Sequence, residues 1–127
     1  MKNTLLIEKG LLKSKTKNEK KLCNSFLNKI DFVELDKKLK NCHLKIKIEN
    51  VYTVAYKDEL RCYVDINLLV IDGYHIIKEK VSDYALMKKK AKQLENEIFA
   101  LTNINLTINE YSFDSNTNII YSYLMIK

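Results

Sequence analysis

The chain has no proline, no tryptophan, two glycines and two histidines among its 127 residues. Because Gly10 and Gly73 are its only glycines, it cannot contain a glycine-rich phosphate loop or a dinucleotide-binding fingerprint. Active sites usually need tight backbone turns around a substrate, and many need a histidine that titrates near neutral pH. The shortage of both predicts a protein that is not an enzyme, with no catalytic residues and no cofactor.

Long apolar runs are also missing. No run approaches the ~18 residues that a membrane-spanning helix requires. The runs in the stretch MKNTLLIEKGLLKSK are shorter than the about 7–15 apolar residues of a secretory signal. The three cysteines, Cys23, Cys42 and Cys62, are an odd number and cannot all pair within one chain. We therefore expect reduced thiols in a protein that is not secreted and is cytoplasmic or particle-bound.

Cysteine and histidine do not follow a known metal-binding pattern. The spacing of Cys42, His43, Cys62 and His75 matches no zinc finger, ribbon or knuckle, and adjacent residues of a strand point to opposite sides. A nucleophilic pair of Cys62 and His75 has no third residue to orient it and no glycine-rich turn to bind an oxyanion. We expect no metal, and we interpret the cysteines as buried structural thiols.

Basic charge is concentrated in the first half of the chain. Residues 1–63 hold fifteen Lys and Arg against eight Asp and Glu, whereas residues 64–127 hold seven against eight. Such a half attracts acidic partners or a phosphate backbone. Its densest part is a candidate basic patch: Lys13, Lys15, Lys17, Lys20 and Lys21. However, every basic residue except Arg61 is lysine, and phosphate recognition favours the planar arginine fork. AT-rich coding would give the same surplus of lysine, asparagine and isoleucine without any ligand.

The apolar pattern predicts an arm followed by one domain. Residues 1–15 are expected to form an N-terminal arm or a short strand, and residues 16–127 a single α+β domain of ordinary size. A first helix is expected from Asn18 to about Asp31, on the helical spacing of Leu22, Phe26, Ile30 and Val33. The stretch ELDKKLKN is off this stripe and is expected to form a separate helical turn or two.

From Leu44 the period changes to two. Even-numbered positions from Leu44 to Tyr56 are apolar apart from Asn50, and the alternation resumes from Leu60 to Val70 after the polar turn KDE. Two alternating runs around a short polar turn predict a β-hairpin with these even-numbered residues on one face. Asp72 and Gly73 favour a tight turn, so we expect a third strand, YHIIKEK, directly after them.

The stretch DYALMKKKAKQLENEIFAL predicts a second main helix, Asp83 to Leu101, with Ser82 as its N-cap. Its apolar face is expected to comprise Tyr84, Met87, Ala91, Leu94, Ile98 and Leu101. At 100° per residue, the four lysines from Lys88 to Lys92 spread over most of the polar arc instead of forming one line. We expect them to be a solvated helix face and not a site that follows a phosphate backbone.

The C-terminal part predicts a second hairpin, formed by INLTINEYSF and NIIYSYLMI with the polar DSNTN between them. The last strand is apolar on both faces, as expected of a strand that is covered on both sides or that lies against another subunit. These patterns together predict an α+β fold: a mostly antiparallel sheet of about five strands with two main helices packed on one face.

Tyrosine is abundant, with eight residues. Its large apolar body and polar tip suit surfaces that are wet in one state and buried in another. Three residues of the first hairpin region fall on the parity opposite to its apolar face, and four lie on one face of the last strand. Together they form a candidate interface: Tyr63, Leu69, Ile71, Ile119, Tyr121, Tyr123 and Met125. The alternative is that they line the edge of the core in a monomer.

The order of predicted elements resembles that of small bacteriophage tail-completion and tail-terminator proteins. The resemblance covers about residues 16–127, including the segments ELRCYVDINLLVIDG and IIYSYLMIK, and it rests on element order without a diagnostic motif. The proline-containing turn that many of these proteins have before the sheet is missing here. The resemblance implies a subunit without catalytic residues that forms a homo-oligomeric ring through sheet edges and the tyrosine-bearing strand face. Its expected location is the cytoplasm of a bacterial host or the virion.

A function from a different class stays open beside this one. The basic first half also fits a binding module for nucleic acid or for a nucleic-acid-bound protein, such as a small phage-encoded inhibitor of a host defence complex. The mass in solution and salt-dependent retention on DNA or RNA distinguish the two alternatives. Neither involves a membrane.

Overall fold

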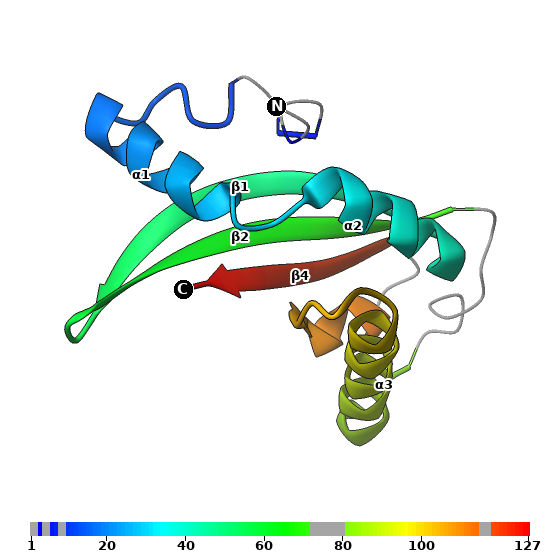
Figure 1. The fold of residues 1–127 in the computed structure, drawn as a ribbon. Helices are drawn as coiled ribbons and strands as arrows, with labels where there is room; N and C mark the ends of the chain where they lie inside the picture. Colours follow the sequence, from blue (N-terminus) through cyan, green and yellow to red (C-terminus); the bar gives the residue numbers. More distant parts are fainter. Residues whose placement is uncertain (1–2, 4–5, 8–9, 72–80, 115–117) are drawn as a thin grey trace.

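The computed structural model describes residues 3, 6–7, 10–71, 81–114 and 118–127 (Figure 1). In chain order, the elements are α1 (Lys17–Leu27), α2 (Phe32–Leu39), β1 (Leu44–Tyr56), β2 (Glu59–Val70), α3 (Tyr84–Thr102), β3 (Leu106–Ile108) and β4 (Ile119–Ile126). Two short 3₁₀ helices, η2 (Lys40–Cys42) and η4 (Glu110–Asp114), complete them. The predicted α+β class is confirmed. Within the described residues the sheet has four strands instead of about five. The same residues form three α-helices, where two main helices were expected.

The four strands form one antiparallel sheet in the order β1-β2-β4-β3. The third strand predicted at YHIIKEK lies outside the described residues. The strand predicted at INLTINEYSF is wrong in length, because only three of its residues pair with β4. The reason lies at Asn109, whose side-chain oxygen accepts a hydrogen bond from the amide of Tyr111 (2.9 Å). That turn starts η4, so the chain leaves the strand at once.

The first hairpin is confirmed, with Tyr56 opposite Glu59 and a two-residue turn between them. The predicted face of its side chains is wrong for the second half of β1. A bulge between Ile48 and Asn50 shifts the register, so that Val51 is buried while Tyr52, Val54 and Tyr56 are not. An extra residue in one strand moves every later side chain to the other face. The even-numbered residues of β1 therefore do not share one face.

The helices begin at acceptor side chains. The Thr16 hydroxyl accepts from the amide of Glu19 (3.2 Å), and the Asp31 carboxylate accepts from that of Glu34 (3.0 Å). α1 ends at Leu27 with Asn28 as its C-cap, so the predicted end near Asp31 is too late, and Asp31 is instead the N-cap of α2. Asp83 caps α3 through the amide of Ala85 (2.9 Å), so the predicted N-cap at Ser82 is wrong by one residue.

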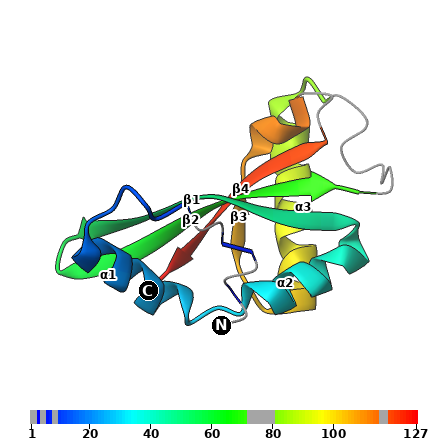
Figure 2. The ribbon, with the colours of Figure 1, turned by 90° about the horizontal axis from the view of Figure 1, so that it is seen from above.

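The core lies on one face of the sheet. Figure 2 shows α1 and α2 on the same side of the strands, and α3 packs against β3 and η4 beside the far edge. Every second residue of β2 and β4 is buried there, and the helices add a complementary set of buried side chains to the same cluster. The largest fully buried ones are Phe32, Phe113, Leu27, Leu35, Leu39, Leu44, Ile66, Leu68, Leu94, Ile98 and Ile120.

The N-terminal segment is attached to the domain by Asn3. Its side-chain amide donates to the carbonyls of Leu27 (3.1 Å) and Ile30 (2.9 Å), and its side-chain oxygen accepts from the amide of Phe32 (2.9 Å). These groups belong to the end of α1 and the start of α2, where backbone groups lack helical partners. In the described part of residues 1–15 the backbone forms turns and no strand. None of the described helices is long and apolar enough to cross a membrane.

Candidate functional site: an uncovered sheet face lined by tyrosines

The face of the sheet opposite the core is not covered by any described helix. We call it the open face, and it consists of the outward residues of the four strands. In the paired rows of the sheet these include Lys45, Lys47, Asn50, Tyr52, Arg61, Tyr63, Asp65, Asn67, Leu69, Thr107, Ile119, Tyr121, Tyr123 and Met125. Every one of them is half-buried or exposed. The open face is therefore accessible to solvent in the described part of the chain.

Three tyrosines form a row of ring contacts across this face. The rings of Tyr52 and Tyr63 stack with centroids 5.6 Å apart and planes 15° apart. Tyr63 also meets Tyr123 at 5.9 Å with a tilt of 52°. Aromatic side chains in such contacts hold one another in place, so they form a preorganised apolar platform. Burial, followed by the nearby Asp65 carboxylate, raises the pKa of Tyr52, which keeps its hydroxyl protonated.

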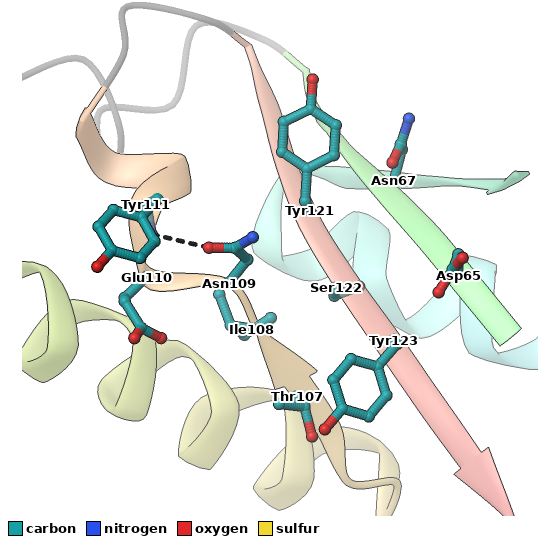
Figure 3. A pocket seen from close by; sticks show the side chains of 10 residues that line it. All are labelled: Asp65, Asn67, Thr107, Ile108, Asn109, Glu110, Tyr111, Tyr121, Ser122 and Tyr123. Carbon is teal, nitrogen blue, oxygen red and sulfur yellow. Dashed lines mark hydrogen bonds between the residues drawn. The ribbon is translucent and has the colours of Figure 1, made fainter. Parts of the chain in front are cut away.

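A pocket of about 450 Å³ lies where this face meets η4 (Figure 3). It has two carboxylates, three tyrosines, two carboxamides and no basic residue in its wall. The lining residues are Asp65, Asn67, Thr107, Ile108, Asn109, Glu110, Tyr111, Tyr121, Ser122 and Tyr123. For a chain with a net charge of +6, a concave surface without a single lysine or arginine is unusual. Its chemistry is suited to a cation.

The η4 side of the pocket is held by a second aromatic pair. The Tyr84 hydroxyl donates to the Glu110 carboxylate (2.7 Å), and the Tyr84 and Tyr111 rings lie 5.7 Å apart. This hydrogen bond raises the pKa of Tyr84 and lowers the pKa of Glu110, so Glu110 stays ionised. Asp65 lies on the opposite wall (Figure 3) and makes no hydrogen bond or ion pair with another described residue.

The structure brings most of the predicted interface residues together. Six of the seven lie on the open face: Tyr63, Leu69, Ile119, Tyr121, Tyr123 and Met125. Ile71 lies just beyond β2, where its amide donates to the carbonyl of His43 (2.8 Å). The last strand was expected to be covered on both sides or to contact another subunit. β4 is a central strand, but the described part of the chain covers only one of its faces, and Tyr121 and Tyr123 are 46% and 40% exposed.

Three residues of this site were missed by the sequence pattern. The alternation placed Tyr52 on the core face, whereas Asp65 and Tyr111 were assigned to no site. The bulge beside Asn50 brings Tyr52 to this surface, the Asx turn at Asn109 brings Tyr111, and the pairing of β4 with β2 makes Asp65 part of the pocket. The only local signal of the register shift in the sequence was Asn50 followed by Val51, a single apolar residue outside the even-numbered alternation.

The predicted basic patch lies on a different part of the molecule. Its residues belong to α1 and the turn before it, in the helical layer. Lys13, Lys17 and Lys21 are exposed, and Lys15 and Lys20 are half-buried. None of the five forms an ion pair within the described residues. α1 lies at one end of the molecule, whereas η4, beside α3, lies at the other (Figure 1).

The lysine run of α3 has the distribution that its sequence predicted. Lys88, Lys89 and Lys92 are exposed and Lys90 is half-buried. Lys88 lies over the Tyr84 ring (5.9 Å to the centroid), and Lys92 is 4.0 Å from Glu95. The lysines therefore engage separate neighbours and do not converge.

The three cysteines are free, and Cys23 and Cys62 are buried in the core. Burial raises the pKa of the Cys62 thiol to about 11, so it is protonated at neutral pH. His75, its proposed partner in a nucleophilic pair, lies outside the described residues. Among the residues that are described, no three His, Cys, Asp or Glu side chains are grouped so that they could hold a metal ion.

Comparison with known proteins found no matching family model, no matching curated protein and no matching solved structure.

Proposed function

We propose that this protein is a non-enzymatic subunit of a homo-oligomeric assembly, and that the open face is its main contact surface. The observation that carries the proposal is the row of Tyr52, Tyr63 and Tyr123 on a sheet that helices cover on one side only. In the single chain Tyr123 of this row is 40% exposed. Buried between subunits, such rings provide large contact areas at a small cost in conformational entropy.

Exposed apolar side chains beyond the open face support an assembly. The tip of the β1–β2 hairpin has Val54, Tyr56 and Leu60 in solvent, with Tyr56 51% exposed. Single exposed apolar residues are normal, but a group of them is typical of a protein that contacts others.

The bacteriophage tail-completion resemblance gives this proposal a specific form. A ring at a tail end needs flat subunits that contact their neighbours on two sides and carry no catalytic machinery. In this chain the sheet has β1 as a long edge strand and β3 as a short one. The strand edges and the open face are the surfaces through which such a ring would form.

A nucleic-acid-binding module is the second candidate, favoured by the unpaired lysines from Lys13 to Lys21. Aromatic rings on an open sheet can also stack on bases. The charge beside the rings speaks against this use, because Lys47 lies 3.3 Å from Glu49 and Arg61 lies 3.0 Å from Glu59. The open face also holds Lys45, which forms no ion pair within the described residues, but Lys45 lies opposite Leu69 and not opposite a ring of the row. A nucleic-acid site would place free cations beside the rings.

The test is the mass of the purified protein in solution, measured by light scattering over a range of concentrations. We expect a defined oligomer that dissociates when Tyr121→Ser and Tyr123→Ser are combined. The matched control combines Leu86→Ser with Phe99→Ser, which removes apolar side chains of similar exposure from α3 and should leave the oligomer intact. A wild-type monomer that is retained on DNA or RNA and released by salt contradicts the proposal and supports the binding module.

A further inference from the structure

The pocket between β4 and η4 has no assigned ligand, and its walls have the composition of a cation site. Tyr111, Tyr121 and Tyr123 contribute aromatic rings, and Asp65 and Glu110 contribute carboxylates. Aromatic faces attract ammonium groups within about 6 Å of the ring centre, and carboxylates add direct charge attraction. The other lining residues are uncharged, so no lysine or arginine of the wall competes for this role.

The two carboxylates differ in how they are held. Glu110 already accepts a hydrogen bond from the Tyr84 hydroxyl (2.7 Å), which fixes its position on the η4 wall. Asp65 is half-buried on β2 and makes no hydrogen bond or ion pair with another described residue. A carboxylate that is partly removed from water without a partner loses hydration, and an incoming cation would restore that loss.

The same chain carries a complementary set of unpaired cations. Lys13, Lys17 and Lys21 project from α1 and the turn before it, and they form no ion pair within the described residues. The only arginine, Arg61, is already engaged by Glu59 (3.0 Å) and by the Tyr56 ring (4.8 Å). A cation supplied by this protein is therefore a lysine ammonium group.

We propose that the pocket binds lysine side chains from the segment Lys13–Lys21 of a second copy of this chain. α1 and η4 lie at opposite ends of the molecule (Figure 1), so a copy that fills a neighbour's pocket keeps its own pocket open. The contact joins two different surfaces, and such head-to-tail contacts continue until they close into a ring or extend as a filament. This inference rests on the proposed function and names the contact by which the subunits join.

The experiment uses two full-length variants that each lack one side of the contact. The pocket variant combines Asp65→Asn with Glu110→Gln, which removes two charges with little change in shape. The segment variant combines Lys17→Gln with Lys20→Gln and Lys21→Gln. Each alone should raise the dissociation constant of self-association by about tenfold to a hundredfold, because the pocket variant loses charge attraction and the segment variant loses both charge and cation–π attraction.

Mixing the two variants gives the decisive readout. The pocket variant keeps its lysines and the segment variant keeps its pocket, so an equimolar mixture has one working contact per pair. Native mass spectrometry should show mixed dimers and no larger species. Mixed dimers show that the lysines of the pocket variant occupy the pocket of the segment variant, whereas no mixed species at all contradicts a contact between these two surfaces.

A matched control removes equal charge elsewhere. Asp58→Asn with Glu97→Gln changes two exposed carboxylates outside the pocket, and Lys37→Gln with Lys40→Gln and Lys89→Gln changes three exposed lysines outside the segment. Both should assemble like the wild type. If the wild type assembles and the pocket and segment variants do too, the pocket contact is wrong while the assembly function stands. A wild-type monomer overturns both.

Discussion

Tyr52 and Tyr63 stack across β1 and β2, with their ring planes 15° apart. They lie opposite each other only because the bulge before Asn50 shifts the register of β1. A double-mutant cycle with Tyr52→Ala and Tyr63→Ala should give a coupling of about 0.5–1.5 kcal/mol in the free energy of unfolding. Urea denaturation of the two single variants and the double variant at low protein concentration measures it. Tyr84→Ala with Tyr63→Ala is the control pair and should be additive, since the Tyr84 ring contacts Tyr111 and its hydroxyl contacts Glu110.

The hairpin turn contains a side chain in a conformation that favours glycine. Lys57, the first of the two turn residues, has a φ of 56°, and Asp58 does not have a positive φ. A positive φ at the first position is the pattern of a type II′ turn, where glycine is preferred. Lys57→Gly should raise the free energy of unfolding by about 0.5–1 kcal/mol, even with the loss of the exposed Lys57–Tyr56 contact. Asp58→Gly serves as the control, and an equal gain there would contradict the assignment.

A buried carboxylate protects part of the exposed edge of β1. Asp36 of α2 is 9% exposed and accepts a hydrogen bond from the amide of Ile46 (2.9 Å). Asp36→Ala leaves that amide without a partner and should lower the free energy of unfolding by about 1–3 kcal/mol. Asp36→Asn keeps an acceptor and should lose less. Chemical denaturation compares them, and turbidity on heating should rise most for the alanine variant because unpaired strand edges promote aggregation.

The thiol of Cys62 makes stability depend on alkaline pH. Its pKa is raised from 9.0 to about 11 in the folded protein, so between these values the unfolded chain loses this proton and the folded chain keeps it. Unfolding is therefore favoured as the pH rises from 9 to 11, and the wild type should lose up to about 3 kcal/mol relative to Cys62→Ala over that range. The measurement is urea denaturation at several pH values. Equal slopes for both proteins would show that the thiol does not ionise on unfolding.

The sequence predicted the parts of this fold that depend on long, regular periodicity. The hairpin from Leu44 to Val70 and the helix beginning near Asp83 are long enough for repeated apolar positions to determine their type. The polar face of that helix was also predicted, because charged residues spread around an arc are a local property of the sequence.

Single residues that interrupt a period caused the errors. The bulge next to Asn50 depends on how β1 pairs with β2, which is a tertiary property. The turn at Asn109 ends β3 after three residues, although apolar residues continue to Phe113. Both errors concern asparagines, whose side chains replace backbone hydrogen bonds locally.

The candidate site was predicted only in part. Tyr63, Tyr121 and Tyr123 were assigned to one surface because strand parity places them there. The pocket combines residues from β2, β3, η4 and β4, and parity within a strand says nothing about which strands are neighbours. From the sequence alone, Asp65 is an ordinary solvated strand residue, and only the pairing of β4 with β2 makes it part of the pocket.

The position of β4 between β2 and β3 has a consequence for the synthesis of this protein. β3 is made before β4 but pairs with no other strand among the described residues, and β1 is the only other described strand that pairs with β2. On the ribosome the hairpin can form early, whereas the hydrophobic side of α3 must wait for residues 119–126 to emerge before its layer is closed. Nascent chains that stall before that point would expose this surface to chaperones and proteases, so translation speed over the last strand should influence the yield of native protein.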